Sequence, residues 1–311
     1  MGLSKSGKTS IKKVVFEKMS PHESVFLEPT QSIESYKVES LGYSSLVVRD
    51  FPSNYNFDKA AANELKYFST CGVLIFVMDS QEINEETYEC FKEVVINALI
   101  KNPRLSIEIF VHKADGAYFL KTNDMNKHRA EIQTRIKDIL TELQIEINPG
   151  FYSTSIYDHS LYEAFSKIFQ KIMPQNGYLS NLLDNLTNSC RFEKAYLFDV
   201  FNKIYLAIDF SPMEEQFYEI CSDMIDVVTD MSGIYGENRN NGNIFDESSY
   251  SLIKISNSSR IENSKSLLYL RFLDANLALI SIINEENFER QHLIDYNIKL
   301  FKEAVKEILK N

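Results

Sequence analysis

The chain has 311 residues, of which 44% are hydrophobic and 25% charged, and its formal net charge is -11. This composition is ordinary for a globular protein, and the length is enough for two domains. Lys and Arg form no cluster, and the longest apolar run, at 72–78, is too short to cross a bilayer, so we expect neither nucleic-acid binding nor direct membrane insertion. The four cysteines and five histidines show no disulfide or metal-ligand spacing, which favours a reducing, cytoplasmic location.

The first ten residues, M-G-L-S-K-S-G-K-T-S, contain the phosphate-binding loop pattern G-x-x-x-x-G-K-[ST]. Glycines let the backbone bend tightly around phosphate, and amide groups at a following helix start point inward. Lys8 would reach the β- and γ-phosphates, and the Thr9 hydroxyl would ligate Mg²⁺. The predicted phosphate-binding residues are Gly2, Lys5, Ser6, Gly7, Lys8, Thr9 and Ser10. The same stretch fits the weaker myristoylation pattern M-G-x-x-x-[ST], which uses the same glycine.

The first half predicts alternating helices and strands. In chain order we expect a helix at 8–19 ended by a proline, a loop at 22–34, a strand pair at 36–40 and 45–49, a short helix at 59–68, a strand at 72–79, a helix at 84–101, a strand at 106–111, a helix at 125–143, a strand at 151–153 and a helix at 161–172. Apolar strands that alternate with helices favour a mainly parallel sheet covered on both faces.

The second half has a different pattern, and the P-Q-N-G stretch at 174–177 predicts a domain boundary between 1–173 and 174–311. We expect a helix at 178–188, strands at 195–200 and 204–209, a helix at 213–231, a mobile loop at 236–247, strands at 250–256, 266–273 and 276–283, and a helix at 285–309. This is an α+β layout with an antiparallel sheet. Apolar stripes on the helices at 213–231 and 285–309 predict packing against that sheet, and a pairing surface is the alternative.

Three further features of the first half point to a guanine nucleotide. Asp50 ends a strand, where its carboxylate can hold Mg²⁺ through water, and Thr30 lies in the preceding loop. Alone, each of these would be an ordinary turn or loop residue. His112-Lys113-Ala114-Asp115 ends the strand at 106–111, and its carboxylate can accept two hydrogen bonds from guanine that adenine cannot supply. Taken alone, the stretch from His112 to Asp115 would be a solvated charged loop. The backbone of Ser155 and Ile156 would meet the base edge, and the His112 and Lys113 side chains complete the predicted guanine site.

These motifs and several longer stretches resemble the Rag-type small GTPases, specifically the C/D (fungal Gtr2-like) branch. The stretches are KVVFEKMSPHESVFLEPT (13–30), RDFP (49–52), FVHKADG (110–116), TSIYDHSLYEAFSKIFQKIMPQ (154–175) and EKAYLFDVFNKIYLAIDFSP (193–212). The resemblance covers essentially the whole chain. It implies an α/β Ras-like G domain, with a P-loop and a mostly parallel sheet, followed by an α+β roadblock-type (longin-related) dimerisation domain.

The resemblance also implies a function and partners. The ligands would be GTP or GDP with Mg²⁺, and Thr9, Thr30 and Asp50 would form the metal site. The chain would pair with an A/B-type Rag GTPase, dock on a scaffold complex at the lysosomal or vacuolar surface, and signal amino-acid sufficiency to TOR complex 1. The alternative is a non-switching scaffold subunit that stabilises its A/B-type partner. A P-loop ATPase or kinase is disfavoured by the HKAD motif.

Two features depart from the family pattern. The switch sequence is D-F-P-S where the family has D-F-P-G, and Asn54 stands where the family has a water-orienting Gln. Ser53 keeps the backbone N–H that faces the γ-phosphate, but Asn is one methylene shorter than Gln. These differences predict slow or absent intrinsic GTP hydrolysis, and we assign no catalytic residue.

The second departure is that the strand expected before the phosphate loop is missing, which predicts a gap in the middle of the sheet. The full match of the following residues favours an incomplete chain over a degenerate domain.

Overall fold

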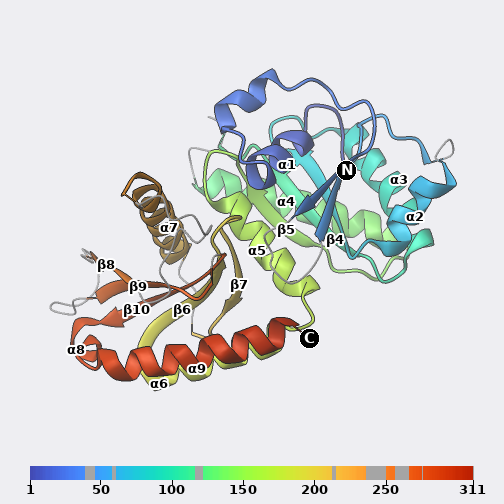
Figure 1. Cartoon of the computed structure of the whole chain (residues 1–311). Helices are drawn as coiled ribbons and strands as arrows, with labels where there is room; N and C mark the ends of the chain where they lie inside the picture. The colour runs from blue at the N-terminus through green and yellow to red at the C-terminus, as the bar shows by residue number, and fades with distance from the viewer. Residues whose placement is uncertain are drawn as a thin grey trace. The chain divides into compact units, whose positions relative to one another are not determined.

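The computed structural model describes residues 1–38, 46–57, 61–115, 122–211, 215–235, 250–255, 266–274 and 276–310. These fall into two compact units (Figure 1), one of residues 1–38 and 46–164 and one that begins at Phe165. The division lies within helix α5 (Ser160–Ile172). The domain boundary predicted after residue 173 stays a prediction.

The first unit contains nearly all of the elements expected from its sequence. They are α1 (Lys8–Phe16), η1 (Pro21–Phe26), β1 (Glu34–Val38), β2 (Leu46–Asp50), α2 (Ala62–Thr70), β3 (Val73–Asp79), α3 (Glu85–Lys101), β4 (Ser106–His112), α4 (Thr122–Glu142), β5 (Gly150–Thr154) and α5. The exception is η1, a 3-10 helix where a loop was predicted. Pro21 sits in its first turn, and the Ser24 hydroxyl donates to the Pro21 carbonyl at 2.7 Å, which closes the turn locally.

The strands of this unit form two separate sheets instead of one. Strands β3, β4 and β5 are parallel neighbours, whereas β1 and β2 form an antiparallel pair. The free edge of β3 is met by Met1, whose ammonium group donates to the Ile75 carbonyl at 2.7 Å and whose carbonyl accepts from the Val77 N–H at 2.8 Å. Among the described strands, no ladder joins β2 to β3, which agrees with the gap predicted in the middle of the sheet.

The pair β1–β2 is attached to the unit through α1. Lys12, which is buried on α1, forms ion pairs with Glu34 on β1 and with Glu17. The Tyr36 hydroxyl donates to the Phe16 carbonyl at 3.0 Å, and the two rings lie 6.5 Å apart. These contacts hold Asp50, at the end of β2, near the start of α1.

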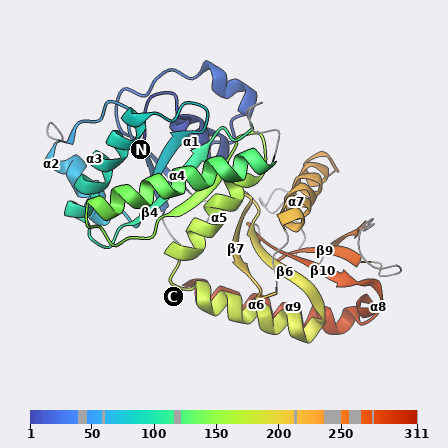
Figure 2. The same cartoon turned by 180° about the vertical axis from the view of Figure 1, so that it is seen from behind.

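One face of the parallel sheet carries the larger core of this unit. Side chains from alternate positions of β3 and β4 pack against α2, α3 and α4, and Figure 2 shows α3 and α4 on the near side of this sheet. The members that are least exposed are Phe76, Met78, Ile109, Phe91, Val95, Ala98 and Ile136. Because parallel strands end together, this packing brings the carboxyl ends of β3, β4 and β5 to one edge.

The second unit is a five-stranded antiparallel sheet between helices. Its elements are α6 (Asn176–Cys190), β6 (Phe192–Asp199), β7 (Ile204–Ile208), α7 (Glu215–Tyr235), β8 (Tyr250–Ile255), β9 (Ser266–Phe272), β10 (Leu277–Asn284), α8 (Glu285–Phe288) and α9 (Gln291–Lys310). The strand order is β7-β6-β10-β9-β8, with α6 and α9 side by side on one face and α7 on the other (Figures 1 and 2). The loop predicted at 236–247 lies outside the described residues.

The final helix was predicted as one segment but is two. The Asn284 side chain caps α8 by accepting from the Glu286 N–H at 3.1 Å, and the Phe288 ring packs 6.0 Å from that of Tyr269. The chain then turns through an Arg290 N–H to Asn287 carbonyl bond before α9 begins. The contact between the Phe288 and Tyr269 rings therefore sets the direction of α8. The sequence between α8 and α9 contains no Gly or Pro that would have predicted the turn.

The two apolar stripes have different environments. On α9, Ile294, Ile298, Phe301 and Val305 are buried and Ile308 is partly buried, which confirms the prediction that this helix covers the sheet. On α7, Met224 of the predicted stripe is buried, whereas its members Phe217, Ile220 and Val228 are only partly buried. Tyr218 and Cys221 beside the stripe are also buried, and Val227 is 50% exposed.

Across the described ranges, no helix combines the length and the apolar character needed to cross a bilayer. The four cysteines are free thiols, and Cys190 and Cys221 are buried within the second unit.

Candidate functional site

The loop at residues 2–7 packs so closely against the parallel strands that both of its motif glycines are required. Gly7 caps α1 with a left-handed backbone (φ 96°), and a Cβ there would lie 2.5 Å from the His112 ring. Gly2 has φ 138°, and a Cβ there would lie 2.2 Å from the Val77 carbonyl oxygen. The glycines therefore fix the loop at the carboxyl ends of β3 and β4.

The Lys8 side chain folds back and is hydrogen-bonded to the start of this loop. Its Nζ donates to the carbonyls of Gly2 at 2.8 Å and Leu3 at 2.6 Å, and the buried Ser6 hydroxyl donates to the same Leu3 carbonyl at 2.9 Å. Burial lowers the pKa of Lys8, which Asp50 partly opposes. The ammonium group is thus held by neutral carbonyls, and an anion bound at the helix start would supply the missing negative charge.

Three side-chain oxygens converge at one end of the site. The Thr9 hydroxyl donates to Asp50 Oδ2 at 2.6 Å and lies 2.7 Å from the Thr30 hydroxyl, which is 3.5 Å from the same carboxylate oxygen. Neighbouring ligands around an octahedral Mg²⁺ are separated by about 2.9 Å, which follows from metal–oxygen distances near 2.05 Å. The Thr9–Thr30 spacing and the all-oxygen donor set therefore fit Mg²⁺, with Asp50 close enough to act through a bound water.

His112 connects the phosphate loop to the other end of the site. Its Nδ1 lies 3.0 Å from the Thr154 hydroxyl on β5, and the opposite side of the ring faces Gly7. Burial, with a smaller effect of Lys113, lowers the pKa of His112 to about 4. The imidazole is therefore neutral near pH 7, and it joins β4, β5 and the start of α1.

The residues after His112 form the other end of the site. Lys113 pairs with Asp79 at the end of β3, and its carbonyl accepts from the Ser80 hydroxyl at 2.9 Å. The exposed Asp115 carboxylate accepts from the buried Ser155 hydroxyl at 2.6 Å. Asp115 is exposed and lines the cavity described below, so its carboxylate can also accept hydrogen bonds from a ligand.

Both ends open into one cavity of about 410 Å³, a volume typical of small-molecule sites. Eleven of the fifteen predicted site residues line it: Lys5, Gly7, Lys8, Thr9, Ser10, Thr30, Ser53, His112, Lys113, Asp115 and Ile156. The other four, Gly2, Ser6, Asp50 and Ser155, make the supporting contacts described above.

The sequence reasoning missed several residues that line or support the cavity. Gln81 lines it, and Asp79 and Ser80 hold Lys113; the signal for all three was their place at the end of β3, beside the end of β4. Val25 and Tyr157 also line the cavity. Nothing in the sequence signalled either position, because Val25 lies in a stretch predicted as a loop and Tyr157 belongs to no motif.

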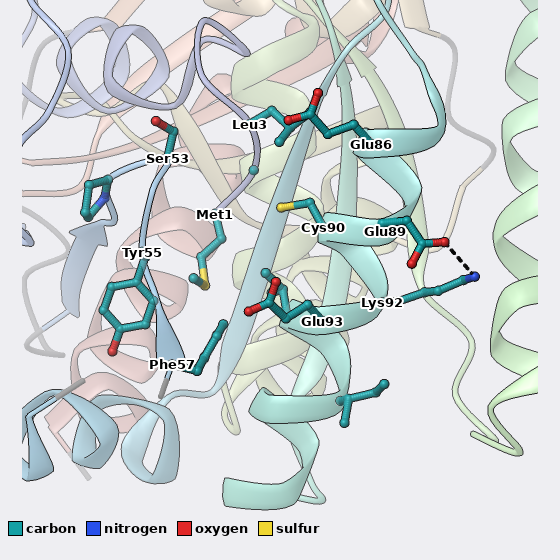
Figure 3. A pocket seen from close by; sticks show the side chains of 14 residues that line it. Met1, Leu3, Ser53, Tyr55, Phe57, Glu86, Glu89, Cys90, Lys92 and Glu93 are labelled. Atoms are coloured by element: carbon teal, nitrogen blue, oxygen red, sulfur yellow. Dashed lines mark hydrogen bonds and ion pairs between the residues drawn. The ribbon is translucent and has the colours of Figure 1, made fainter. Parts of the chain in front are cut away.

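A second cavity of about 600 Å³ lies between the segment after β2 and helix α3 (Figure 3). Met1 extends between Tyr55 and Phe57 on one side and Cys90 on the other. Ser53 lines both cavities. Its φ is negative, so the serine at this position causes no backbone strain, and Asn54 beside it is exposed.

A glycine loop and lysine at a helix start, together with a His-Lys-Ala-Asp loop at the end of a neighbouring parallel strand, define a P-loop protein of the Ras-like G-protein class. The family model of the Gtr1/RagA G protein conserved region matches residues 1–225. The chain therefore belongs to the Rag/Gtr family of GTP-binding proteins.

Sequence identity to individual family members shows the branch of the family to which the chain is similar. The chain is 41% identical to the Ras-related GTP-binding protein C of Homo sapiens, over 99% of this chain and 75% of that protein. It is 40% identical to the GTP-binding protein gtr2 of Schizosaccharomyces pombe, over 99% of this chain and 96% of that protein. The solved structure of Myxococcus xanthus MglB covers 44% of this chain and 92% of its own, at 16% identity and a TM-score of 0.34, too low to define the fold.

We predict that His112 makes folding stability pH-dependent. Its pKa is about 4 in the folded protein and about 6.5 when unfolded. The unfolded chain therefore binds a proton first as pH falls, and stability present above pH 6.5 is progressively lost toward pH 4. The loss from this group at pH 5 is about 2 kcal/mol. Urea unfolding at pH 7 and pH 5 should show this extra loss in the wild-type protein and not in His112→Asn. Equal losses in the two proteins would contradict the prediction.

We predict that the two switch substitutions limit GTP hydrolysis. A Ser53→Gly/Asn54→Gln variant restores the family sequence and the longer amide, so its single-turnover rate should exceed that of the wild-type protein by tenfold or more, on the order of the effect of one positioned group. Asn56→Gln, the same change two residues further on, is the matched control and should leave the rate unchanged. A wild-type rate already equal to that of the double variant would exclude this explanation.

Proposed function

We propose that this protein is a guanine-nucleotide-dependent regulatory switch, the C/D-type subunit of a Rag heterodimer. The observation that carries the proposal is a single cavity with a magnesium-type oxygen cluster at one end and the Asp115 carboxylate at the other. Phosphates would lie against the loop of Lys8, and a purine base would lie against the loop of Asp115.

The proposed roles follow from this arrangement. The phosphate-binding residues are Gly2, Lys5, Ser6, Gly7, Lys8, Thr9 and Ser10, the switch residues are Thr30, Asp50 and Ser53, and the guanine-binding residues are His112, Lys113, Asp115, Ser155 and Ile156. The exposed Asp115 carboxylate supports guanine selectivity, because guanine presents an N1–H and a 2-amino group where adenine has no such donor pair. When bound, Mg²⁺ would be held by Thr9 and Thr30 directly and by Asp50 through water, and it would neutralise phosphate charge.

Thr30 supports a switch rather than constant binding. It lies between α1 and β1, and its hydroxyl is held by Thr9 and Asp50 across 21 and 20 residues of sequence. A nucleotide with a γ-phosphate offers Thr30 a different set of contacts from one without it. That difference in contacts is what a ligand needs to shift the conformation of the segment.

The second unit supports a pairing role for the proposed roadblock-type domain. β8 is an edge strand, with Leu252 and Ile253 each 39% exposed, and α7 keeps Val227 50% exposed. An open strand edge and a partly exposed apolar helix flank suit association with a similar domain. By resemblance, that partner is an A/B-type Rag, and the heterodimer would be recruited from the cytoplasm by a scaffold complex to the lysosomal or vacuolar surface, where it signals amino-acid sufficiency to TOR complex 1.

The non-switching scaffold alternative is not favoured. Thr9, Thr30 and Asp50 converge, and Lys8 and Asp115 line the same cavity. A subunit with only a structural role would have no need of this arrangement.

We predict guanine-specific binding that depends on Asp115. At 100 times its dissociation constant, GDP or GTP adds about 2.7 kcal/mol of stability, which raises the melting temperature by several degrees, whereas ATP leaves it unchanged. Asp115→Asn should lose this shift and gain one with xanthosine diphosphate, whose 2-oxo group accepts a hydrogen bond from the new amide. Asp138→Asn, an exposed carboxylate on α4, is the matched control and should keep the guanine preference. Shifts with ATP equal to those with GTP would refute the assignment.

We predict that Val227 lies in the heterodimer interface. Val227→Asp would bury an unpaired charge against the partner, so the affinity for a co-expressed A/B-type Rag should fall about tenfold or more. Thr229→Asp adds the same charge two residues further along α7, on a different side of the helix, and should assemble normally. Sedimentation of the two co-purified complexes measures this, and equal assembly of both variants would place the interface elsewhere.

A further inference from the structure

The segment between α1 and β1, residues 17–33, lines one side of the 410 Å³ cavity, and we call it the strap. Six of its residues line the cavity: Ser24, Val25, Leu27, Glu28, Pro29 and Thr30. Val25 is 73% exposed although it lines the cavity, so it is not part of the core. A ligand of nucleotide size in the cavity would therefore lie against the strap.

Two of the strap's contacts lie one at each end of the cavity. At the metal end, the Thr30 hydroxyl lies 2.7 Å from that of Thr9. At the base end, the His22 ring lies 5.7 Å from the Tyr157 ring with an angle of 47° between their planes. The first attachment is made by a group expected to contact the metal, and the second is made only by side chains of the protein.

Tyr157 is well placed to hold the strap near a bound base. It directly follows Ile156 and lines the cavity itself. Its N–H donates at 3.1 Å to the Ser155 hydroxyl, which donates in turn to Asp115. The residue that would read the base and the residue that holds the strap therefore share one hydrogen-bonding partner.

We infer that His22 and Tyr157 form a clasp that keeps the strap closed over the nucleoside and slows release of GDP and GTP alike. The inference rests on the proposed function, because it needs a nucleotide in the cavity. The clasp lies at the base end, so it acts whether or not a γ-phosphate is present. The Thr30 attachment acts mainly on the triphosphate state. Both residues position the strap and neither is catalytic.

The size of the effect follows from the kind of contact. Aromatic pairs of this geometry correspond to about a two- to tenfold change in a rate or equilibrium constant. Opening of such a segment commonly limits ligand release. Loss of the ring contact should therefore appear in the dissociation rate, with little change in association.

The test measures dissociation of fluorescent GDP and GTP analogues from the full chain by stopped-flow chase with unlabelled nucleotide. His22→Ala and Tyr157→Ala should each raise both dissociation rates about two- to tenfold, and the double variant should release no faster than the faster single variant. His22→Phe retains a ring and should keep slow release. Thr30→Ala should speed release of the GTP analogue more than that of the GDP analogue.

Phe26→Ala is the matched control, because Phe26 is an aromatic residue of the same 3-10 helix that is 84% exposed and does not line the cavity. It should release both analogues at the wild-type rate. Wild-type rates in His22→Ala and Tyr157→Ala would overturn the clasp and leave the proposed function intact. Failure of the wild-type protein to bind either analogue would overturn both.

Discussion

The close packing of Gly7 against the His112 imidazole is the contact on which the candidate site depends. It places the start of α1 directly on the carboxyl end of β4, with no side chain between them. Because the same imidazole is bonded to Thr154 on β5, it also sets the distance between the phosphate loop and the loop that follows β5. The ring must be neutral and buried to do both, and its lowered pKa is the electrostatic consequence of that burial. One buried side chain thus connects the two ends of the cavity.

The two ends are also connected through the strap and the loops around it. The Thr9–Thr30–Asp50 cluster ties the strap to α1 and β2, while the ring of Tyr157 meets it at His22. Tyr157 is joined through Ser155 to Asp115, so a ligand that draws the Asp115 carboxylate toward a base alters the hydrogen bonding of the same serine. A ligand that occupies the metal end alters Thr30. Under the proposed function, the strap would respond to occupancy at either end, because these two contacts lie beside different parts of the nucleotide.

The sequence predicted the parts of this site whose chemistry is local. Gly2, Gly7 and Lys8 form a fixed pattern because backbone bending and helix-start geometry require those residue types at that spacing. Asp50, Thr30 and the His112–Asp115 loop were predicted from their order along the chain. The missed features depend on contacts between distant segments: Asp79 and Gln81 matter through Lys113, and Tyr157 through His22. The 3-10 helix η1 and the break before α9 likewise depend on single side-chain contacts that leave no periodic pattern.

The split between the two sheets shows how Asp50 can be held in position without a continuous sheet. Strands β1 and β2 have no main-chain ladder to β3, so the position of Asp50 cannot come from strand pairing with the rest of the unit. It comes from α1, where burial opposes the charge of Lys12 but Glu34 and Glu17 raise the pKa of Lys12, so the ion pair persists. The Tyr36–Phe16 contact adds a second attachment on the same helix. Thr9 is also on α1. Both partners of the Thr9–Asp50 hydrogen bond are therefore held in position by the same helix. The geometry of the metal end therefore depends on α1, and anything that shifts the start of α1 moves Thr9 and Asp50 together.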